Sequence, residues 1–430
     1  MCGIAGQFGK SDAGFAEAAA RGLRHRGPDS QAVWRGEGVV LAHTRLAIID
    51  LAESGNQPML WDGAGGVSNA PQVVDGAAVA VDAGAKAALV FNGEIYNFKE
   101  LREGLLRAGE RFHGESDTEV LFRILLREGE AALPKLRGMF AFAFWDGVKR
   151  AGLLARDALG IKPLYFRRDG AALEFASESK ILAREGDEPD AEGVRDYFLW
   201  GSFQEPATAR RAVRMLPAGH VLRWGTGGVV QAKWSKVDFR STNRVEGGHA
   251  VFARECLQQS VAKHLRSDVP VGIFLSGGLD STALLALARQ ILGSGAAIRT
   301  YSIGFDDAGA DESPIAKRTA EFFKTEHTEW VVTAQDAAGE VAGFLRSVDQ
   351  PTIDGFNVWC VCKLARRHGT KVALSGQGGD ELFGGYPSFK TIPGLRAMRS
   401  ALGPLRVAAA GVLGLAGGES KWKRLAAFFG

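Results

Sequence analysis

The pattern of apolar residues changes once along the chain, near residue 250, and this change limits the fold more than any other feature. Before about residue 215, short segments typical of strands, such as 89–91 and 141–145, alternate with glycine-rich turns. Beyond residue 250, helical stretches alternate with apolar strands at 269–275, 299–303 and 371–374. The sequence therefore predicts an α+β domain with antiparallel sheets, followed by an α/β domain with a parallel sheet.

The length of the chain agrees with two domains. Its 430 residues exceed what one hydrophobic core usually organises. Pro217, Gly219 and the glycine-rich segment 225–228 indicate a boundary. We expect a first domain over residues 2–217, a linker over 218–247 and a second domain over 248–430. The Gly-, Ala- and Val-rich segment 62–88 is expected to form a long hairpin or surface insertion.

Composition excludes several classes of protein. With 46% apolar residues, 23% charged residues and a net charge of +3, the chain has no charge excess that would attract nucleic acid or a membrane surface. Its amino terminus lacks the pattern of a secretory signal, and its longest apolar stretch, 407–418, is well below the ~20 residues that cross a bilayer. The four cysteines show neither a disulfide framework nor zinc spacing. A cytoplasmic protein with small-molecule partners is expected.

The second residue is a candidate nucleophile. Cys2 becomes the first residue once Met1 is removed, and its small side chain permits that removal. Its α-amino group, with an ordinary pKa of ~7.7–8.0, can then accept the thiol proton in place of a histidine. Nucleophile and base would belong to one residue.

Attack on a carboxamide also needs an oxyanion hole and contacts to the charged end of the substrate. The Asn92 side chain and the Gly93 backbone N–H can form the hole. Arg45 suits a bidentate contact to an α-carboxylate, and Glu94 and Asp117 suit an α-ammonium.

Each of these residues also has an ordinary structural interpretation. A cysteine after the initiator methionine is usually incidental, an Asn-Gly pair is often a hairpin turn, and Asp117 fits the first turn of a helix. That helix is signalled by a capping box of Ser116 and Glu119. Only the combination favours a catalytic site.

Six segments together resemble a class II glutamine amidotransferase domain: CGIAG (2–6), RHRGPD (24–29), RLAIID (45–50), NGEIYN (92–97), SDTE (116–119) and RDALGIKP (156–163). The resemblance implies an N-terminal-nucleophile hydrolase fold, a four-layered αββα sandwich. It also implies Cys2 as nucleophile, Asn92 and Gly93 as oxyanion hole, and Arg45, Asn92, Glu94 and Asp117 as glutamine contacts.

A second motif lies in the α/β half. An apolar strand runs directly into SGGLDS (276–281), and a helix follows. Hydroxyl groups and glycine backbone at a helix amino terminus bind phosphate, so Ser276, Gly277, Gly278 and Ser281 are expected to hold a pyrophosphate, with Asp280 on an accompanying Mg²⁺. The chain lacks a GxxxxGK[ST] sequence, which argues against a Walker-type kinase or GTPase.

This motif is that of the N-type ATP pyrophosphatases, of the adenine nucleotide α-hydrolase type, which leave an adenylate. With YSIGF (301–305), DES (311–313), QPT (350–352) and SGQGGDELFGGY (375–386), the chain resembles the glutamine-hydrolysing asparagine synthetases over most of residues 1–390. The resemblance implies ATP contacts from Leu275, Ile303, Ser375 and Gly376, aspartate binding nearby, and Asp380 as a further metal ligand.

The reaction that the resemblance implies is that of a carbon–nitrogen ligase with glutamine as amido donor. Cys2 releases ammonia from glutamine, ATP activates aspartate as β-aspartyl-AMP with loss of pyrophosphate, and asparagine and AMP result. Only unprotonated ammonia is nucleophilic, so an apolar passage between the two sites is expected to keep it unprotonated. Another acceptor, a peptide or a surface sugar acid, remains an alternative, as does a protein with glutaminase activity alone. Glucosamine-type or phosphoribosyl transfer is disfavoured by SGGLDS. A homodimer is left open.

Two departures from the family pattern bear on the ATP site. Where many relatives carry Glu, this chain has Gln377, and an amide cannot act as a base at neutral pH. We treat Gln377 as a site residue with an altered role. The chain also stops at residue 430, before further helices with a lysine of the synthetase site that the family pattern contains, so a truncated second domain is expected.

Overall fold

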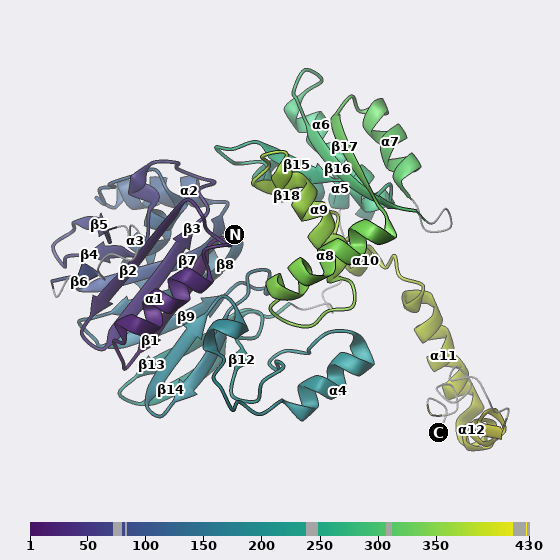
Figure 1. Cartoon of the computed structure of the whole chain (residues 1–430), viewed down its shortest axis with the longest axis horizontal. Helices are drawn as coiled ribbons and strands as arrows, with labels where there is room; N and C mark the ends of the chain where they lie inside the picture. The colour runs from purple at the N-terminus through teal and green to yellow at the C-terminus, as the bar shows by residue number, and fades with distance from the viewer. Residues whose placement is uncertain (72–79, 82–83, 238–247, 307–311, 416–426, 428–430) are drawn as a thin grey trace.

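The computed structural model describes residues 1–71, 80–81, 84–237, 248–306, 312–415 and 427. Three sheets organise these residues: two antiparallel sheets in the amino-terminal half and one parallel sheet in the carboxyl-terminal half (Figure 1). Parts of the 62–88 insertion, the 218–247 linker, the DES segment and the chain's last residues lie outside the described residues. The two predicted fold classes are confirmed, in the predicted order.

The first sheet contains the strand that begins next to Cys2. Its order is β12 (Arg214–Met215), β10 (Tyr165–Asp169), β11 (Ala172–Ala176), β1 (Gly3–Phe8), β3 (Val39–Arg45), β2 (Ser30–Gly36) and β6 (Ala80–Val81). All neighbours are antiparallel except β2 and β6. In the centre, Gly3 of β1 lies opposite Thr44 of β3, so the chain just before β1 adjoins the chain just after β3.

The second sheet is entirely antiparallel. Its order is β14 (Gly228–Lys233), β13 (His220–Gly225), β9 (Ala151–Arg156), β8 (Gly138–Asp146), β7 (Ala87–Ile95), β4 (Met59–Trp61) and β5 (Val67–Asn69). The linker predicted over 218–247 is therefore wrong over residues 220–233, because β13 pairs with β9 and β14 pairs with β13. The prediction failed because glycine-rich turns at the ends of these strands resemble linker sequence.

Helices cover the outer face of each sheet and complete four layers. Helix α1 (Ala13–Gly22) packs on the first sheet, and α2 (Phe98–Arg107) and α3 (Asp117–Glu128) pack on the second. Strand β8 shows how the layers form, because alternate side chains point to opposite faces. Ala141, Ala143 and Trp145 face the other sheet, whereas Phe140 and Phe142 face the helices. The predicted αββα sandwich is confirmed.

Helix α3 starts where the sequence predicted. The Ser116 hydroxyl accepts a hydrogen bond from the Glu119 backbone N–H at 3.2 Å, and Asp117 lies in the first turn. The reciprocal half of the predicted capping box does not form. The Glu119 carboxylate instead accepts hydrogen bonds from the backbone N–H groups of His113 and Gly114, which fixes the loop before the helix.

The third sheet is parallel, with the order β17 (Glu326–Val332), β16 (Arg299–Phe305), β15 (Val271–Phe274) and β18 (Val372–Leu374). Side chains of α5 (His249–His264), α6 (Leu279–Leu292) and α7 (Ser313–Phe322) form one core with Ile273 and Leu275. On the other face, α9 (Gly355–Arg367) packs against Tyr301. Strand β15 and the edge strand β18 are parallel neighbours, so their carboxyl ends lie at the same end of the sheet.

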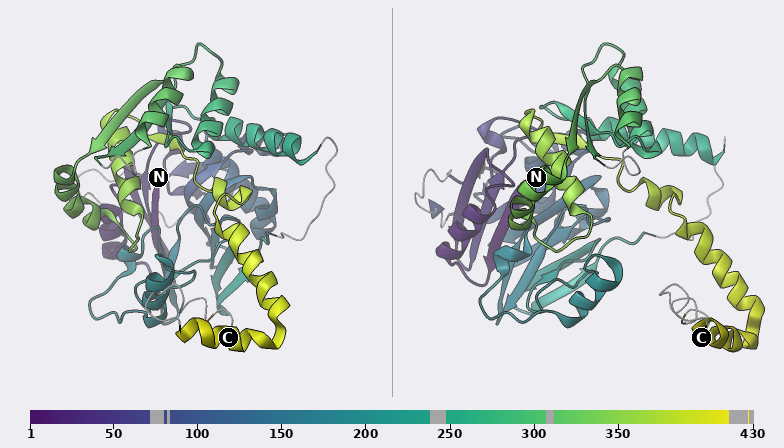
Figure 2. Two further views of the ribbon diagram at one scale, coloured as in Figure 1. Left: turned by 90° about the vertical axis from the view of Figure 1, so that its right-hand side faces the viewer. Right: turned by 45° about the vertical axis from the view of Figure 1, so that its right-hand side comes forward.

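The remaining elements are short or peripheral. They are α4 (Ala191–Trp200), α8 (Ala334–Ser347), α10 (Gly379–Phe383), α11 (Ser388–Leu402), α12 (Arg406–Leu415) and the 3₁₀ turns Glu53–Gly55, Gly129–Lys135, Ser179–Leu182 and Gly403–Leu405. Figure 2 shows α11 and α12 extending away from the parallel sheet. Among the described residues, no helix combines the length and apolarity needed to cross a membrane.

Polar contacts join the two halves. The Asp29 carboxylate accepts hydrogen bonds from the Lys371 ammonium at 2.9 and 3.0 Å, and Lys371 directly precedes β18. The Asp268 carboxylate accepts a hydrogen bond from the Asp50 backbone N–H at 2.8 Å. Asp29 and Asp50 belong to segments that flank the amino-terminal pocket, so the contacts reach the surroundings of Cys2.

Candidate functional sites

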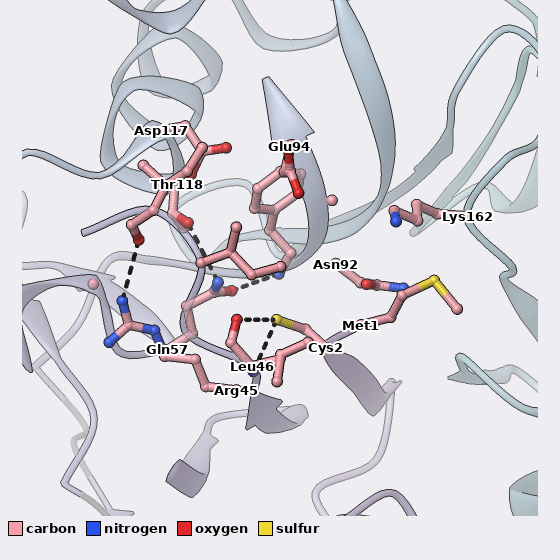
Figure 3. Close-up of a pocket in the computed structure, with 15 residues that line it drawn as sticks. Met1, Cys2, Arg45, Leu46, Gln57, Asn92, Glu94, Asp117, Thr118 and Lys162 are labelled. Atoms are coloured by element: carbon pink, nitrogen blue, oxygen red, sulfur yellow. Dashed lines mark hydrogen bonds between the residues drawn. The ribbon is translucent and has the colours of Figure 1, made fainter. Parts of the chain in front are cut away.

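A pocket of about 520 Å³, part of it open to solvent, lies where β1, β3 and β7 meet (Figure 3). Its walls are formed by Met1, Cys2, Arg45, Leu46, Ile48, Ile49, Gly55, Gln57, Phe91, Asn92, Gly93, Glu94, Asp117, Thr118 and Lys162. All residues that the sequence assigned to glutamine cleavage and binding therefore line a single cavity.

Cys2 lies at the floor of this pocket, one residue before β1. Its Sγ accepts a hydrogen bond from the Leu46 backbone N–H at 3.4 Å and lies 3.8 Å from the Leu46 carbonyl oxygen. The Arg26 side chain donates to the Cys2 carbonyl at 3.0 Å. A Cβ on Gly3 would lie 2.6 Å from the Thr44 hydroxyl, so glycine is required for this close approach of β1 to β3. The Leu46 backbone thus holds the thiol, and Arg26 holds the Cys2 backbone.

Asn92 carries the clearest sign of a ligand. It is fully buried, yet neither its Oδ1 nor its Nδ2 has a hydrogen-bond partner among the described residues. Leaving a buried amide unpaired costs about 1–3 kcal/mol per group, so a folded protein retains one where a ligand completes it. Gly93 follows with its Cα pressed against the Met139 carbonyl of β8, which leaves no room for a side chain.

Arg45 is positioned by the loop that follows β3. Its guanidinium donates to the Ala52 carbonyl at 2.7 Å, to Asn56 Oδ1 at 2.9 Å and to the Asp50 carbonyl. Across the pocket, Asp117 Oδ2 accepts a hydrogen bond from the Ile95 backbone N–H at 2.9 Å. A cation and an anion are therefore held on rigid backbone, as recognition of an amino acid's charged end requires.

Burial perturbs the acids and the amine of the pocket. It raises the pKa of Glu94 to about 7 and that of Asp117 to about 6. It lowers the pKa of the Met1 α-amino group to about 6, so in the chain that retains Met1 this amine is a free base at neutral pH. Such shifts concentrate at functional sites because catalysis needs groups poised near the working pH.

Two pocket residues were missed by the sequence prediction. Gln57 accepts a hydrogen bond from the Phe91 N–H at 2.6 Å and donates to the Thr118 hydroxyl at 3.3 Å, which joins the two walls. Lys162 belongs to the RDALGIKP segment but received no role. Figure 3 shows its amine directed toward the pocket, on the side of Cys2 opposite Asp117 and Thr118. Neither residue has a local pattern that would have revealed it.

The second candidate site lies at the carboxyl end of β15. Ser276 Oγ is 3.1 Å from Ser281 Oγ, and the Gly278 N–H donates to Ser276 Oγ at 3.3 Å. Gly277 adopts a φ of +78°, which favours glycine. The predicted order of strand, loop and helix is confirmed, with α6 starting at Leu279.

The neighbouring strand β18 brings the second glycine-rich loop to the same place. A Cβ on Gly376 would lie 2.9 Å from the Ser281 backbone nitrogen, and one on Gly379 would overlap the Asp280 carboxylate. Ser375 and Gln377 are exposed in this loop. The structure thus brings the two motifs into contact although about 95 residues separate them.

Two predicted ATP contacts differ in their accessibility. Leu275 is only 1% exposed and packs in the core with Ile273, so a nucleotide can reach only its backbone. Ile303 lies partly exposed on β16, beside β15.

The predicted magnesium ligands provide a small donor set. Asp280 is partly buried in the first turn of α6, and Asp380 is exposed in the first turn of α10. No group of three or more His, Cys, Asp or Glu side chains that could hold a metal ion is found in the described part of the chain. One or two carboxylates suffice for Mg²⁺ when phosphate oxygens and water complete its shell, so these residues fit a metal that arrives with a nucleotide.

Comparison with known proteins gives matches to both halves. A family model described as a glutamine amidotransferase domain matches residues 1–67 and 73–235, and one described as asparagine synthase matches residues 253–429. The solved structure of glutamine phosphoribosylpyrophosphate amidotransferase from B. subtilis aligns at 15% identity with a TM-score of 0.40, over 87% of this chain and 90% of that one. A likeness this weak supports no inference.

Curated relatives match along most of the chain. Asparagine synthetase [glutamine-hydrolyzing] 1 of Bacillus subtilis is 35% identical over 91% of this chain and 60% of its own length. A putative asparagine synthetase of Mycobacterium tuberculosis is 36% identical over 94% of this chain and 63% of its own length. A putative asparagine synthetase of Methanocaldococcus jannaschii is 32% identical over 90% of this chain and 76% of its own length. The chain spans about 60% of the length of the first of these relatives.

Proposed function

Because the chain belongs to the glutamine-hydrolysing asparagine synthetase family, we propose that it makes asparagine from aspartate, glutamine and ATP. Glutamine would be cleaved in the Cys2 pocket, and aspartate would be activated at the loops that follow β15 and β18. The proposal assigns one half-reaction to each half of the chain.

The unpaired Asn92 amide beside Cys2 is the observation that carries the first half of this proposal. A nucleophilic thiol, an amide without a partner and a nearby cation–anion pair match the parts of an α-amino acid carboxamide. We assign the oxyanion hole to Asn92 Nδ2 and the Gly93 N–H. The α-carboxylate is assigned to Arg45, and the α-ammonium to Asp117 and Glu94.

The chemistry follows from these positions. After removal of Met1, the Cys2 amine takes the thiol proton, and Sγ adds to the glutamine carboxamide carbon. The negative oxygen of the tetrahedral intermediate is stabilised by the hole. Collapse breaks the C–N bond, and the Cys2 ammonium returns its proton to the departing nitrogen, which leaves as ammonia. Water then hydrolyses the thioester to glutamate.

The second half-reaction is proposed for the paired loops. We assign the pyrophosphate of ATP to Ser276, Gly277, Gly278 and Ser281, and the nucleoside to Leu275, Ile303, Ser375 and Gly376. Mg²⁺ held by Asp280 and Asp380 would neutralise phosphate charge. The aspartate β-carboxylate attacks the α-phosphorus, pyrophosphate leaves, and ammonia displaces AMP from the adenylate.

Gln377 is proposed to contact the aspartyl adenylate through hydrogen bonds of its amide. Its exposed position in the loop that touches Asp280 supports this role. In a Gln377→Ala variant, we expect aspartate-dependent exchange of pyrophosphate into ATP to fall about tenfold, the loss of one charged-ligand hydrogen bond. Unchanged exchange would exclude Gln377 from the site.

A cytoplasmic setting and a homodimer complete the proposal. The described structure contains only free cysteines, which supports a reducing cytoplasm. A homodimer remains a prediction that sedimentation of the purified chain can check.

The test of the proposal is a Cys2→Ala variant assayed in three ways. Release of glutamate from glutamine should be lost, by at least about a thousandfold, because the nucleophile is absent. Formation of asparagine and AMP from aspartate, ATP and ammonium should remain within about twofold of the parent. Retained glutamate release would exclude Cys2.

The same assays separate the alternatives. AMP release that requires ATP but not aspartate would indicate another acceptor carboxylate. Glutamate release with no ATP consumption by the parent chain would indicate a glutaminase alone. Free ammonium that competes fully with glutamine-derived nitrogen in the parent would exclude an enclosed passage between the sites.

A further inference from the structure

Lys162 lines the Cys2 pocket, but the reaction described above gives it no part. We propose that Lys162 is a positioning residue of the nucleophile, whose buried ammonium supplies the positive charge that keeps Cys2 reactive near neutral pH. This inference rests on the proposed glutamine cleavage and deepens it.

The turn that carries Lys162 is unusually well fixed. The Asp157 carboxylate accepts hydrogen bonds from the backbone N–H groups of Phe140, Leu159, Ile161 and Lys162, at 3.0 to 3.1 Å. The Arg156 guanidinium donates to the Lys162 carbonyl at 2.8 Å and to the Gly160 carbonyl at 2.6 Å. The other two charged residues of this segment, Arg156 and Asp157, therefore shape the turn. Lys162 is the residue that the turn delivers to the pocket.

The Lys162 side chain is mostly buried and has no direct partner among the described residues. It is only 7% exposed, and its ammonium makes neither a hydrogen bond nor an ion pair with any residue that the structure describes. A buried, unpaired ammonium is costly because it loses its hydration. Lys162 is therefore a mostly buried cation that stability alone does not explain, in the pocket that also holds the unpaired Asn92 amide.

Several charged groups surround this ammonium. Glu94 projects from β7, Cys2 and the amino terminus precede β1, Arg26 lies in the segment after α1, and Asp157 lies in the same turn. Burial lowers the pKa of Lys162, while the charges of Glu94 and Cys2 oppose that effect. The pocket thus favours a charged Lys162 most when Cys2 is a thiolate.

The mutual stabilisation of the Lys162 ammonium and the Cys2 thiolate is the reason for assigning Lys162 a functional role. A cation beside a thiol favours the thiolate, and a cation beside an amine favours the unprotonated amine. A charged Lys162 would therefore lower the pH at which the Cys2 amine and the Cys2 thiol each lose a proton to solvent. Lys162 would therefore extend the active range of Cys2 toward lower pH without touching the substrate.

The experiment follows Cys2 directly. The rate at which iodoacetamide alkylates Cys2 is measured from pH 5 to 9 by mass spectrometry of the amino-terminal peptide, which also verifies removal of Met1. Three variants are compared with the parent: Lys162→Met, which keeps the length and removes the charge; Lys162→Arg, which keeps the charge; and Lys149→Gln, a control at an exposed lysine. Glutaminase kcat/KM is measured over the same range.

In Lys162→Met, we expect the midpoint of alkylation and the acidic limb of kcat/KM to rise together by about one pH unit. At pH 6.5 both rates should fall about threefold to tenfold. Lys162→Arg should stay within about 0.3 unit of the parent, as should Lys149→Gln. A loss of packing alone would lower rates at every pH and would leave the midpoint in place.

Two results would overturn the inference. One is an unchanged midpoint in a folded Lys162→Met protein, and the other is an equal shift in the Met and Arg variants, since charge would then not be the cause. Failure of the proposed function is a separate result. If the parent releases no glutamate from glutamine, the alkylation profile still decides whether Lys162 acts on Cys2.

Discussion

The Cys2 pocket and the paired loops after β15 and β18 are built in opposite ways. In the pocket, polar groups are buried and several lack partners: Asn92 is fully buried, and Lys162 is 7% exposed. In the loops, Ser276, Ser375, Gln377 and Asp380 are exposed, and glycines make the close contacts. The first site is made of side chains inside a core, whereas the second is made of backbone at a sheet edge.

This difference teaches what each site requires from the fold. Side chains aimed into a core cost stability, and a large enclosing sandwich must offset that cost. Backbone N–H groups at a helix start are present in any strand–loop–helix unit and need only room for phosphate. We therefore expect substitutions in the pocket to change stability and activity independently. Substitutions in the loops should lower activity because added atoms overlap neighbouring groups.

The largest effect should come from Asn92→Ala. Removal of an oxyanion donor is expected to lower the kcat for glutamine cleavage by about 10² to 10³. The free energy of unfolding should not decrease by more than about 1 kcal/mol, because no hydrogen bond to another described residue is lost. Paired measurements of glutamate release and thermal unfolding test this. A strongly destabilised but active variant would mean that Asn92 is a structural residue.

Gly379→Ala should affect only the other site. The added methyl group would overlap the Asp280 carboxylate, and its displacement is expected to lower aspartate-dependent AMP release by about 10- to 100-fold, as for misplaced catalytic groups. Glutamate release should stay within about twofold.

Gly394→Ala is the matched control, because no atom lies within 4 Å of its added methyl group. Equal losses of AMP release in the two variants would show that the contact with Asp280 is unimportant.

Asp117→Asn should raise stability while it weakens glutamine binding. Burial raises the pKa of Asp117 to about 6 from an ordinary value of 3.8, so the folded state keeps a proton that the unfolded state has released. This carboxyl therefore destabilises the fold progressively from pH 4 to 6, and fully above pH 6. Asn removes a penalty of about 1–3 kcal/mol at pH 8 and none at pH 3.5.

Calorimetry at these two pH values measures the effect, and the KM for glutamine should rise at the same time. An equal change in the unfolding midpoint at both pH values would contradict the assignment of the effect to ionisation.

The smallest effect is expected where the two regions meet. Lys371→Met removes the ion pair with Asp29, both partners of which are partly exposed, so the loss should be about 0.2–1 kcal/mol and should vanish at high salt. Asp29 also accepts a hydrogen bond from the Ala47 N–H, next to the residue that contacts Cys2. The KM for glutamine should therefore change less than threefold.

Arg299→Met is the control for that variant, because it removes a similarly exposed ion pair within the second half alone. If both variants alter the KM for glutamine equally, the contact at Asp29 transmits nothing to the pocket.

The sequence determined the two fold classes, the start of α3 and the strand–loop–helix unit at SGGLDS. These features depend on local periodicity and on residue types at fixed spacing, which are properties of short segments. The sequence also predicted one glutamine-cleaving site from the combination of Cys2, Arg45, Asn92 and Asp117. The structure places these residues around one cavity.

Tertiary structure alone decided the rest. Residues 220–233 join the second sheet because β13 pairs with β9, about 70 residues earlier, and no local pattern records such a partner. The missing partner of Asn92 and the burial of Lys162 depend on every wall of the pocket. Local sequence sets an element's type, but contacts between distant segments decide which buried groups remain free to react.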